Sequence, residues 1–192
     1  MNAIAQYDAI VMGVSAGGFD ALRAILPTLP AAFPVPLAIV QHQGEDADGF
    51  LCDHLDGIAA IAVAEAHDKM AIQPATAYLA PAGYHLLIGR DRTFSLSVDA
   101  RVHHCRPSID VLFHSAALAY GARLIGVILT GANSDGSEGL RAIKERGGLA
   151  VVQRPDTAAV AAMPQAALDA CEADQILPLS AIGPFLVTCC QA

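Results

Sequence analysis

The sequence predicts an α/β fold: a doubly wound, mostly parallel sheet with helices on both faces and an antiparallel hairpin near one edge. Short apolar runs alternate with segments of helical spacing along the 192 residues. Strands that are apolar throughout are typical of a sheet covered on both faces, and strands separated by helices are usually joined in parallel. Hydrophobic residues make up 54% of the chain and charged residues 16%, which is enough apolar material for a large core.

The first half of the chain is expected to begin with a buried strand over residues 7–14. Gly17 and Gly18 end that strand, and the spacing of Leu22, Ile25 and Leu26 predicts a helix over residues 19–29. The other elements expected in this half are a strand at 37–41, a helix at 48–58 and strands at 62–65 and 77–80.

The second half of the chain begins with the hairpin, predicted from two alternating segments at 84–88 and 93–98. Pro107 is expected at the first position of a helix that runs to about Tyr120. The elements that follow are a buried strand at 124–130, a helix at 136–146, a strand at 149–153 and two or three short helices. No repeat or linker interrupts the chain, so residues 1–192 are expected to form a single domain.

Composition excludes several classes of protein. The net charge of −8 opposes binding to nucleic-acid backbones, and aromatic residues, 5% of the chain with no Trp, offer few surfaces for stacking bases. No apolar run reaches the length of a membrane-spanning helix, and the N-terminus lacks the basic segment of a signal peptide. Five scattered cysteines without a C-x-x-C pair are expected to be reduced thiols, so we expect a cytoplasmic protein that does not insert into a membrane.

Three polar residues each follow a predicted buried strand: Ser15, His42 and Asp135. In a parallel sheet the carboxyl ends of the strands meet at one edge, where ligands bind, so the three side chains can converge there. A serine hydroxyl becomes a nucleophile when an imidazole takes its proton, and a carboxylate orients that imidazole. We therefore predict a Ser15–His42–Asp135 triad, with backbone amides after Ser15 and in the loop 131–133 as oxyanion donors.

The same residues also fit other patterns. Ser15 and Asp135 could each simply cap a helix. Gly13-x-Ser15-x-Gly17 matches the nucleophile elbow of α/β-hydrolases, but that fold has earlier strands and the chain order Ser, acid, His. A dinucleotide-binding fingerprint needs a glycine at position 15 and an acidic residue where His42 stands, so nucleotide binding is disfavoured.

Three histidines and Cys105 in the second half carry side chains that can ligate a metal. The set His103, His104, Cys105 and His114 matches no common zinc spacing, and neither a metal nor a cofactor is expected. Arg106 is interpreted as a residue that positions an acidic substrate or that pairs with Asp110. For His85 we expect a structural hydrogen bond.

Several longer motifs resemble the catalytic domain of the chemotaxis receptor protein-glutamate methylesterases (CheB type). The resemblance runs from about Ile10 to about Leu168. The matching segments are GVSAGG (13–18), IVQH (39–42), YLAPAGYHLLI (78–88), RPSIDVLFHSAA (106–117), GVILTGANSDGSEGL (126–140) and the Met163-Pro164 segment.

The resemblance implies a serine hydrolase that removes methyl esters from glutamates on the cytoplasmic helical domain of methyl-accepting chemoreceptors and releases methanol. It assigns Ser15 as nucleophile, His42 as general base and acid, and Asp135 as the orienting carboxylate. A glutaminase activity, an ester on another signalling protein, and a non-catalytic interaction module stay open as alternatives.

The chain also departs from the family pattern. Ala16 and Ala132 stand where the family usually has Thr and Met, and Gln43-Gly44 and Arg154-Pro155 replace family residues near the expected crevice. The phospho-receiver domain of typical members is not expected within these 192 residues.

Overall fold

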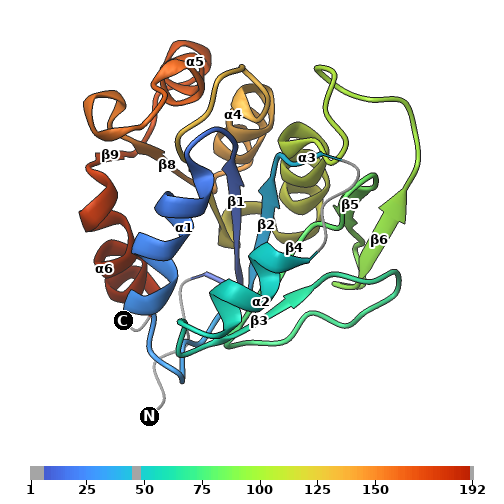
Figure 1. Ribbon diagram of the computed structural model, residues 1–192. Helices are drawn as coiled ribbons and strands as arrows, with labels where there is room; N and C mark the ends of the chain where they lie inside the picture. The colour runs from blue at the N-terminus through green and yellow to red at the C-terminus, as the bar shows by residue number, and fades with distance from the viewer. Residues whose placement is uncertain (1–6, 45–48, 191–192) are drawn as a thin grey trace.

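The computed structural model describes residues 7–44 and 49–190 and contains a seven-stranded parallel sheet (Figure 1). The strand order is β3-β4-β2-β1-β7-β8-β9. In chain order the strands are β1 (Ala9–Val14), β2 (Leu37–Gln41), β3 (Ala62–Glu65), β4 (Thr76–Leu79), β7 (Leu124–Ile128), β8 (Leu149–Gln153) and β9 (Gln175–Leu177). The predicted doubly wound α/β fold is confirmed.

Helices cover both faces of this sheet. One face carries α1 (Gly18–Ile25), α2 (Phe50–Asp56) and α6 (Leu179–Cys190), and the other carries α3 (Ile109–Tyr120), α4 (Ser137–Glu145) and α5 (Ala162–Ala170) (Figure 1). Side chains of β1 alternate between the two cores: Met12 packs with the α1 side and Val11 with the α3 side. Burial on both faces is the physical reason that the strands read as continuous apolar runs.

The predicted hairpin is confirmed as β5 (His85–Ile88) and β6 (Phe94–Ser97), which pair in antiparallel register. It forms a two-stranded sheet of its own, which packs against α3 and also contacts β4. There the ring of Phe94 meets the ring of Tyr78 edge-on, with the centroids 4.9 Å apart.

The structure corrects several predicted boundaries. Ser108, and not Pro107, precedes α3: its hydroxyl caps the helix by accepting a hydrogen bond from the amide of Val111, and Pro107 lies outside the helix after a cis peptide bond. The helix predicted at 19–29 ends at Ile25 and continues as a 3₁₀ turn, η1 (Leu26–Thr28), which contains Pro27. Two further 3₁₀ turns, η2 (Gly121–Arg123) and η3 (Pro155–Thr157), follow α3 and β8.

Other differences are of length. β7 ends at Ile128 rather than at residue 130, and β9 was not expected because three residues carry too little pattern. Asp48, the first residue of the helix predicted at 48–58, and the N-terminal segment 1–6 lie outside the described residues.

The position of β1 at the centre of the sheet sets the location of the site. From β1 the chain crosses one face through α1 to reach β2, whereas β7, the other neighbour of β1, is reached through α3 on the opposite face. The connections therefore diverge around β1, and an open crevice is expected beyond the carboxyl ends of β2, β1 and β7. Ser15, His42 and Asp135 lie in the segments that leave these three ends.

Candidate active site

Ser15 and His42 follow paired positions of two neighbouring strands. Val14, the last residue of β1, is in register with Gln41, the last residue of β2, and the amide of His42 donates to the carbonyl of Val14 at 3.0 Å. Neighbouring strands lie about 4.8 Å apart, so the next residue on each strand is within side-chain reach of the other. Both residues are half-buried.

Two polar side chains tie the loops of this edge together. The amide of Gln41 donates through Nε2 to the carbonyl oxygens of Ser15 (3.0 Å) and His42 (2.8 Å). The backbone carbonyl of Thr130 accepts from the backbone amide of Ser15 at 2.9 Å. The hydroxyl of Thr130 donates to the carbonyl of Ala16 at 2.8 Å. The segment that carries Ser15 is therefore held from both sides by the ends of β2 and β7.

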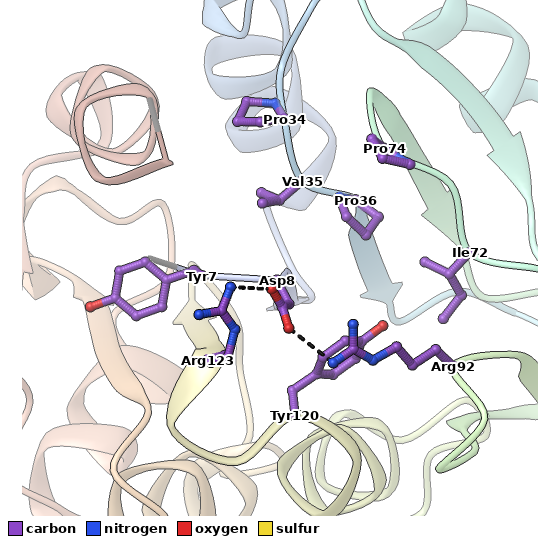
Figure 2. A pocket seen from close by; sticks show the side chains of 10 residues that line it. All are labelled: Tyr7, Asp8, Pro34, Val35, Pro36, Ile72, Pro74, Arg92, Tyr120 and Arg123. Carbon is purple, nitrogen blue, oxygen red and sulfur yellow. Dashed lines mark hydrogen bonds and ion pairs between the residues drawn. The ribbon is translucent and has the colours of Figure 1, made fainter. Parts of the chain in front are cut away.

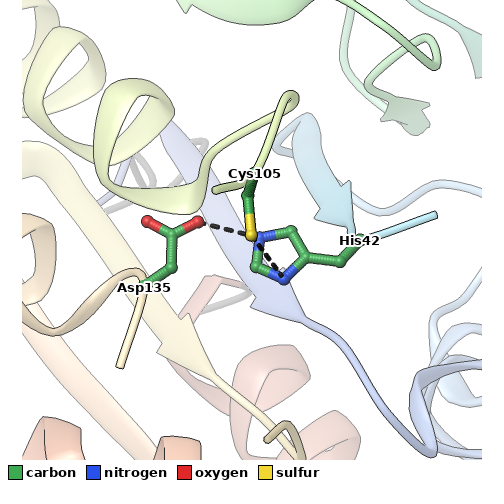
Figure 3. Close-up of side chains that lie close together, drawn as sticks. All are labelled: His42, Cys105 and Asp135. Carbon is green, nitrogen blue, oxygen red and sulfur yellow. Dashed lines mark hydrogen bonds and ion pairs between the residues drawn. The ribbon is translucent and has the colours of Figure 1, made fainter. Parts of the chain in front are cut away.

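Asp135 holds the imidazole of His42. Its Oδ2 lies 2.8 Å from Nε2 of His42, and the carboxylate is fully buried while the histidine side chain is 11% exposed (Figure 3). The two oxygens accept three further hydrogen bonds, from the Ser108 hydroxyl (2.8 Å) and from the amides of Ile109 (2.7 Å) and Asp110 (3.0 Å). Those amides open α3, so Asp135 sits at the positive end of a helix.

These contacts keep Asp135 ionised. Burial acts to raise the pKa of Asp135, but the hydrogen bonds from His42, from the amides of Asp110 and Ile109 and from Ser108 outweigh it, and the pKa lies below its ordinary value. A carboxylate on Nε2 favours the tautomer with the proton on that nitrogen, which leaves a lone pair on Nδ1. His42 is thus oriented to accept a proton at Nδ1.

The thiol of Cys105 lies beside the imidazole of His42, with Sγ 3.8 Å from Nδ1 (Figure 3). Nδ2 of Asn133 donates to the same sulfur at 3.4 Å. Burial, followed by the nearby charge of Asp135, raises the pKa of the Cys105 thiol, so it is protonated at neutral pH. Among the described residues, no hydrogen bond joins the Ser15 hydroxyl to the histidine ring.

Some backbone N–H groups near Ser15 already donate to carbonyl oxygens of the protein, and others can donate to an oxyanion. The amide of Ser15 donates to Thr130, and that of Gly131 donates to the carbonyl of Val160 at 3.1 Å. Within the described segments, the amides of Ala16, Gly17, Ala132 and Asn133 make no backbone hydrogen bond. The oxyanion donors expected from loop 131–133 therefore reduce to residues 132 and 133.

The other residues singled out in the sequence have different partners. His103 pairs with Asp110 (Nε2–Oδ2 3.3 Å), and Arg106 donates to the carbonyl oxygens of Val98 and Asp99. His85 is buried: Nδ1 accepts from the amide of Ser108 and Nε2 lies 3.1 Å from the Ala100 carbonyl, so its expected structural role is confirmed.

Three side-chain contacts of this site were not predicted from the sequence: those of Cys105 with His42, of Asn133 with Cys105, and of Ser108 with Asp135. Ser108 could have been found from its place before a helical segment, as a cap. Cys105 and Asn133 carry no such signal, because their sequence neighbours do not indicate that they meet each other or His42.

Side-chain atoms that can bind a metal ion lie close together in two places among the described residues. One group is His42, Cys105 and Asp135, and the other is His103, Asp110 and Asp135; within each group these atoms lie within 4.8 Å of one another.

A cavity of about 310 Å³ lies at the opposite ends of the strands (Figure 2). Tyr7, Asp8 and Arg123, which precede β1 and β7, line it together with Arg92. The carboxylate of Asp8 pairs with both arginines, at 2.9 Å to Arg92 and 2.5 Å to Arg123. These charges satisfy one another, and among the described residues that line the cavity no nucleophile is paired with a base, so we do not take it as the candidate active site.

Comparison with known proteins identifies the family. The family model described as CheB methylesterase matches residues 10–186. The chain belongs to the CheB methylesterase family. A relative from Leptospira interrogans (strain Fiocruz L1-130), named "Putative protein-glutamate methylesterase/protein-glutamine glutaminase", is 52% identical over 95% of this chain and 94% of its own length.

Two further relatives extend the comparison. "Protein-glutamate methylesterase/protein-glutamine glutaminase 1" of Carboxydothermus hydrogenoformans is 42% identical over 91% of this chain, which spans 53% of that protein. The crystal structure of the Thermotoga maritima CheB methylesterase catalytic domain superposes with a TM-score of 0.92 at 32% identity, covering 95% of this chain and 98% of that one. Within the described residues, no helix is long and apolar enough to cross a membrane.

Proposed function

We propose that this member of the CheB methylesterase family is a cytoplasmic serine esterase that hydrolyses glutamate methyl esters on the helical signalling domains of methyl-accepting chemoreceptors. One observation carries the proposal: the buried carboxylate of Asp135 holds Nε2 of His42 at the carboxyl edge of the sheet, beside the residue that follows β1, Ser15. The names of the Leptospira and Carboxydothermus relatives supply the ester and its glutamate. Residues 1–192 are proposed to act as one catalytic domain.

The first step forms an acyl-enzyme. Ser15 Oγ attacks the ester carbonyl as Nδ1 of His42 takes its proton, and Asp135 stabilises the resulting imidazolium through Nε2. This transfer requires the Ser15 hydroxyl to come within hydrogen-bond distance of Nδ1, beside which the Cys105 thiol lies at 3.8 Å. The C–O bond to the methoxy group then breaks, and the methoxy oxygen leaves as methanol with the proton from His42.

The second step restores the enzyme. Nδ1 of His42 accepts a proton from water, the hydroxide attacks the acyl carbon, and the free glutamate leaves as Ser15 recovers its proton. In both steps negative charge develops on the carbonyl oxygen. The available amides of Ala16, Gly17, Ala132 and Asn133 are the proposed donors to it.

Hydrolysis of a glutamine amide is the second candidate function. The same relatives are named protein-glutamine glutaminases. The reaction needs the same nucleophile and base, with ammonia leaving in place of methanol, so one site can serve both substrates.

The test compares three proteins on a methyl-labelled cytoplasmic receptor fragment: wild type, Ser15→Ala and Ser134→Ala. Ser134 is an exposed serine in the loop after β7 and serves as the matched control. Wild type and Ser134→Ala should release methanol, and Ser15→Ala should release none above background. Equal release by wild type and Ser15→Ala, or none by either, refutes the proposal.

Two readouts separate the alternatives. A fluorophosphonate probe should label Ser15 in the wild type, whereas a non-catalytic interaction module would stay unlabelled. Measuring ammonia from a fragment that carries glutamine at the methylation positions tests the glutaminase activity in the same reaction series.

A further inference from the structure

We infer that Cys105 and His42 form a binding site for a thiophilic divalent cation such as Zn²⁺, and that the bound ion switches the proposed esterase off. The two residues come from different parts of the chain, 63 positions apart, and meet at the carboxyl edge of the sheet. The inhibitory part of the inference rests on the proposed function, whereas the binding part does not.

The separation of the two ligand atoms fits a zinc ion. Sγ of Cys105 and Nδ1 of His42 are 3.8 Å apart. Zinc bonds of about 2.3 Å to sulfur and 2.0–2.1 Å to nitrogen, at a tetrahedral angle, place these two atoms about 3.6 Å apart. The distance therefore suits an ion bonded to both atoms once the two side chains turn so that the Nδ1 lone pair and the sulfur point at the ion. The remaining positions go to water.

The surroundings of both ligands are those of a metal site. A histidine that binds a metal usually donates its other N–H to a carboxylate, and Asp135 accepts from Nε2 of His42 at 2.8 Å. That carboxylate is itself fixed by Ser108 and by two amides of α3. On the other side, Nδ2 of the Asn133 side chain donates to Sγ of Cys105 at 3.4 Å, a contact that stabilises a thiolate.

A tight turn directs Cys105 toward His42. Val102 and Cys105 exchange two backbone hydrogen bonds, of 3.1 and 2.8 Å, around His103 and His104. Both histidines have positive φ, 49° and 64°, a conformation unusual for two successive residues other than glycine. They are exposed while the thiol of Cys105 is half-buried at the site, so the metal ligand of this segment is its cysteine together with His42.

Metal binding and catalysis compete for one lone pair. The proposed reaction needs Nδ1 of His42 free to take the proton of Ser15, and the ion would bind at that same nitrogen. As the metal–sulfur bond forms, the Cys105 thiol releases its proton to solvent, and waters leave the ion as the protein ligands replace them; no electron is transferred. Mg²⁺, which prefers oxygen ligands, should not bind this sulfur–nitrogen pair.

The binding test uses Co²⁺ as a spectroscopic probe on the full chain in metal-free buffer. A thiolate-to-Co²⁺ charge-transfer band should appear in the wild type, disappear on addition of Zn²⁺, and be absent in Cys105→Ser and His42→Ala. Cys52→Ser is the matched control, because the Cys52 thiol is also half-buried and its hydrogen bond to the carbonyl of Val63 is one that serine can make. This control should keep the band.

The inhibition test uses hydrolysis of a chromogenic ester. Zn²⁺ should inhibit the wild type and Cys52→Ser reversibly, with recovery on EDTA, and Mg²⁺ should have no effect. Inhibition of Cys105→Ser, relative to its own metal-free rate, should need about tenfold more Zn²⁺ or higher. A further measurement needs no variant: Zn²⁺ should protect Cys105 of the wild type from iodoacetamide, as mapped by mass spectrometry.

The outcomes separate this inference from the proposed function. Absence of the charge-transfer band in the wild type, an equal band in Cys105→Ser, or unprotected Cys105 in saturating Zn²⁺ overturns the metal site, whatever the esterase activity. A band without methanol release from the methyl-labelled receptor fragment retains the metal site and overturns the proposed function. Equal zinc inhibition of wild type and Cys105→Ser shows that an inhibiting ion binds elsewhere and refutes the switch.

Discussion

Replacing Asp135 by Asn tests how the site holds its base. Oδ2 accepts from His42 and Ile109, and Oδ1 accepts from Ser108 and Asp110, so the carboxylate serves four donors. An asparagine has one oxygen, and its NH₂ group must replace the other. Every orientation of the amide therefore turns an N–H toward a backbone N–H that was previously satisfied.

The two orientations of the amide have different chemical results. With NH₂ at the Oδ1 position, the Ser108 hydroxyl can turn to accept, and the amide of Asp110 loses its partner. With NH₂ at the Oδ2 position, the amide of Ile109 loses its partner, and His42 shifts its proton to Nδ1, the atom that must accept from Ser15. One buried donor is orphaned in either case, which costs about 1–3 kcal/mol of folding stability.

The catalytic loss should exceed the stability loss. Both orientations remove the charge that stabilises the imidazolium, and one of them also gives the wrong tautomer. We expect kcat for methyl-ester hydrolysis to fall by about 10²- to 10⁴-fold, while the protein stays folded. The assay is methanol release at saturating substrate, with urea unfolding of the same preparations.

Asp110→Asn is the control for this substitution. Asp110 is also buried and adjoins the same helix N-terminus, but its side chain accepts from the amide of Gly139 (2.6 Å) and pairs with His103, not with His42. Its activity should stay within an order of magnitude of wild type. If Asp135→Asn also keeps wild-type kcat while Ser15→Ala is inactive, the base does not depend on Asp135 and the reasoning is refuted.

Three further predictions concern the charges and the packing of the site. Burial raises the pKa of Asp110 above 3.8, so the ionised carboxylate destabilises the folded protein at pH values above that raised pKa. Asp110→Asn should therefore have a larger free energy of unfolding than wild type at pH 7. The difference in free energy should disappear in acid, where Asp110 is protonated. The pKa of Asp135 is lowered, so its ionised form stabilises the fold; this stabilisation is complete above pH 3.8 and is lost as the pH falls through the lower pKa of the folded state. The stability difference between wild type and Asp135→Asn should therefore shrink at that low pH. Urea unfolding as a function of pH checks both predictions. In Gly18→Ala, the new Cβ would lie 1.9 Å from Oε1 of Gln41 and 2.6 Å from Val14, so the Gln41 side chain must move. We expect this movement to weaken its hydrogen bonds to the carbonyl oxygens of Ser15 and His42. Its kcat should fall well below that of Gly44→Ala, where nothing lies within 4 Å; equal rates in the two variants would show that the Gln41 bridge does not position the site.

The positions of the helix and strand boundaries show where sequence patterns are informative. Strands 37–41, 62–65 and 149–153 were predicted at their observed bounds. The first and third are apolar runs that follow Pro36 and Gly148 and end in glutamine. The start of α3 was missed by two residues, because Pro107 is equally suited to a turn before the helix and to its first position. β9 was missed because its three residues are a strand only through pairing with β8.

The same distinction applies to the site. The carboxyl-end positions of Ser15, His42 and Asp135 could be read from local patterns, since each follows an apolar strand. The hydrogen bond between His42 and Asp135 agrees with that prediction, while the role of Ser15 stays a prediction for the methanol assay.

By itself, the sequence determined the α/β class, the strands that form the centre of the sheet, and the residues at their ends, because apolar periodicity and helix-ending residues act within a few positions of the chain. Tertiary structure decided which nitrogen of His42 meets Asp135, that Ser108 and two amides hold that carboxylate, and that Cys105 lies beside the other nitrogen. These contacts join residues 25 to 93 positions apart, and their geometry depends on the register of β1 with β2 and on the packing of α3. No local pattern encodes such distances, because they arise only when the sheet and its helices are packed together.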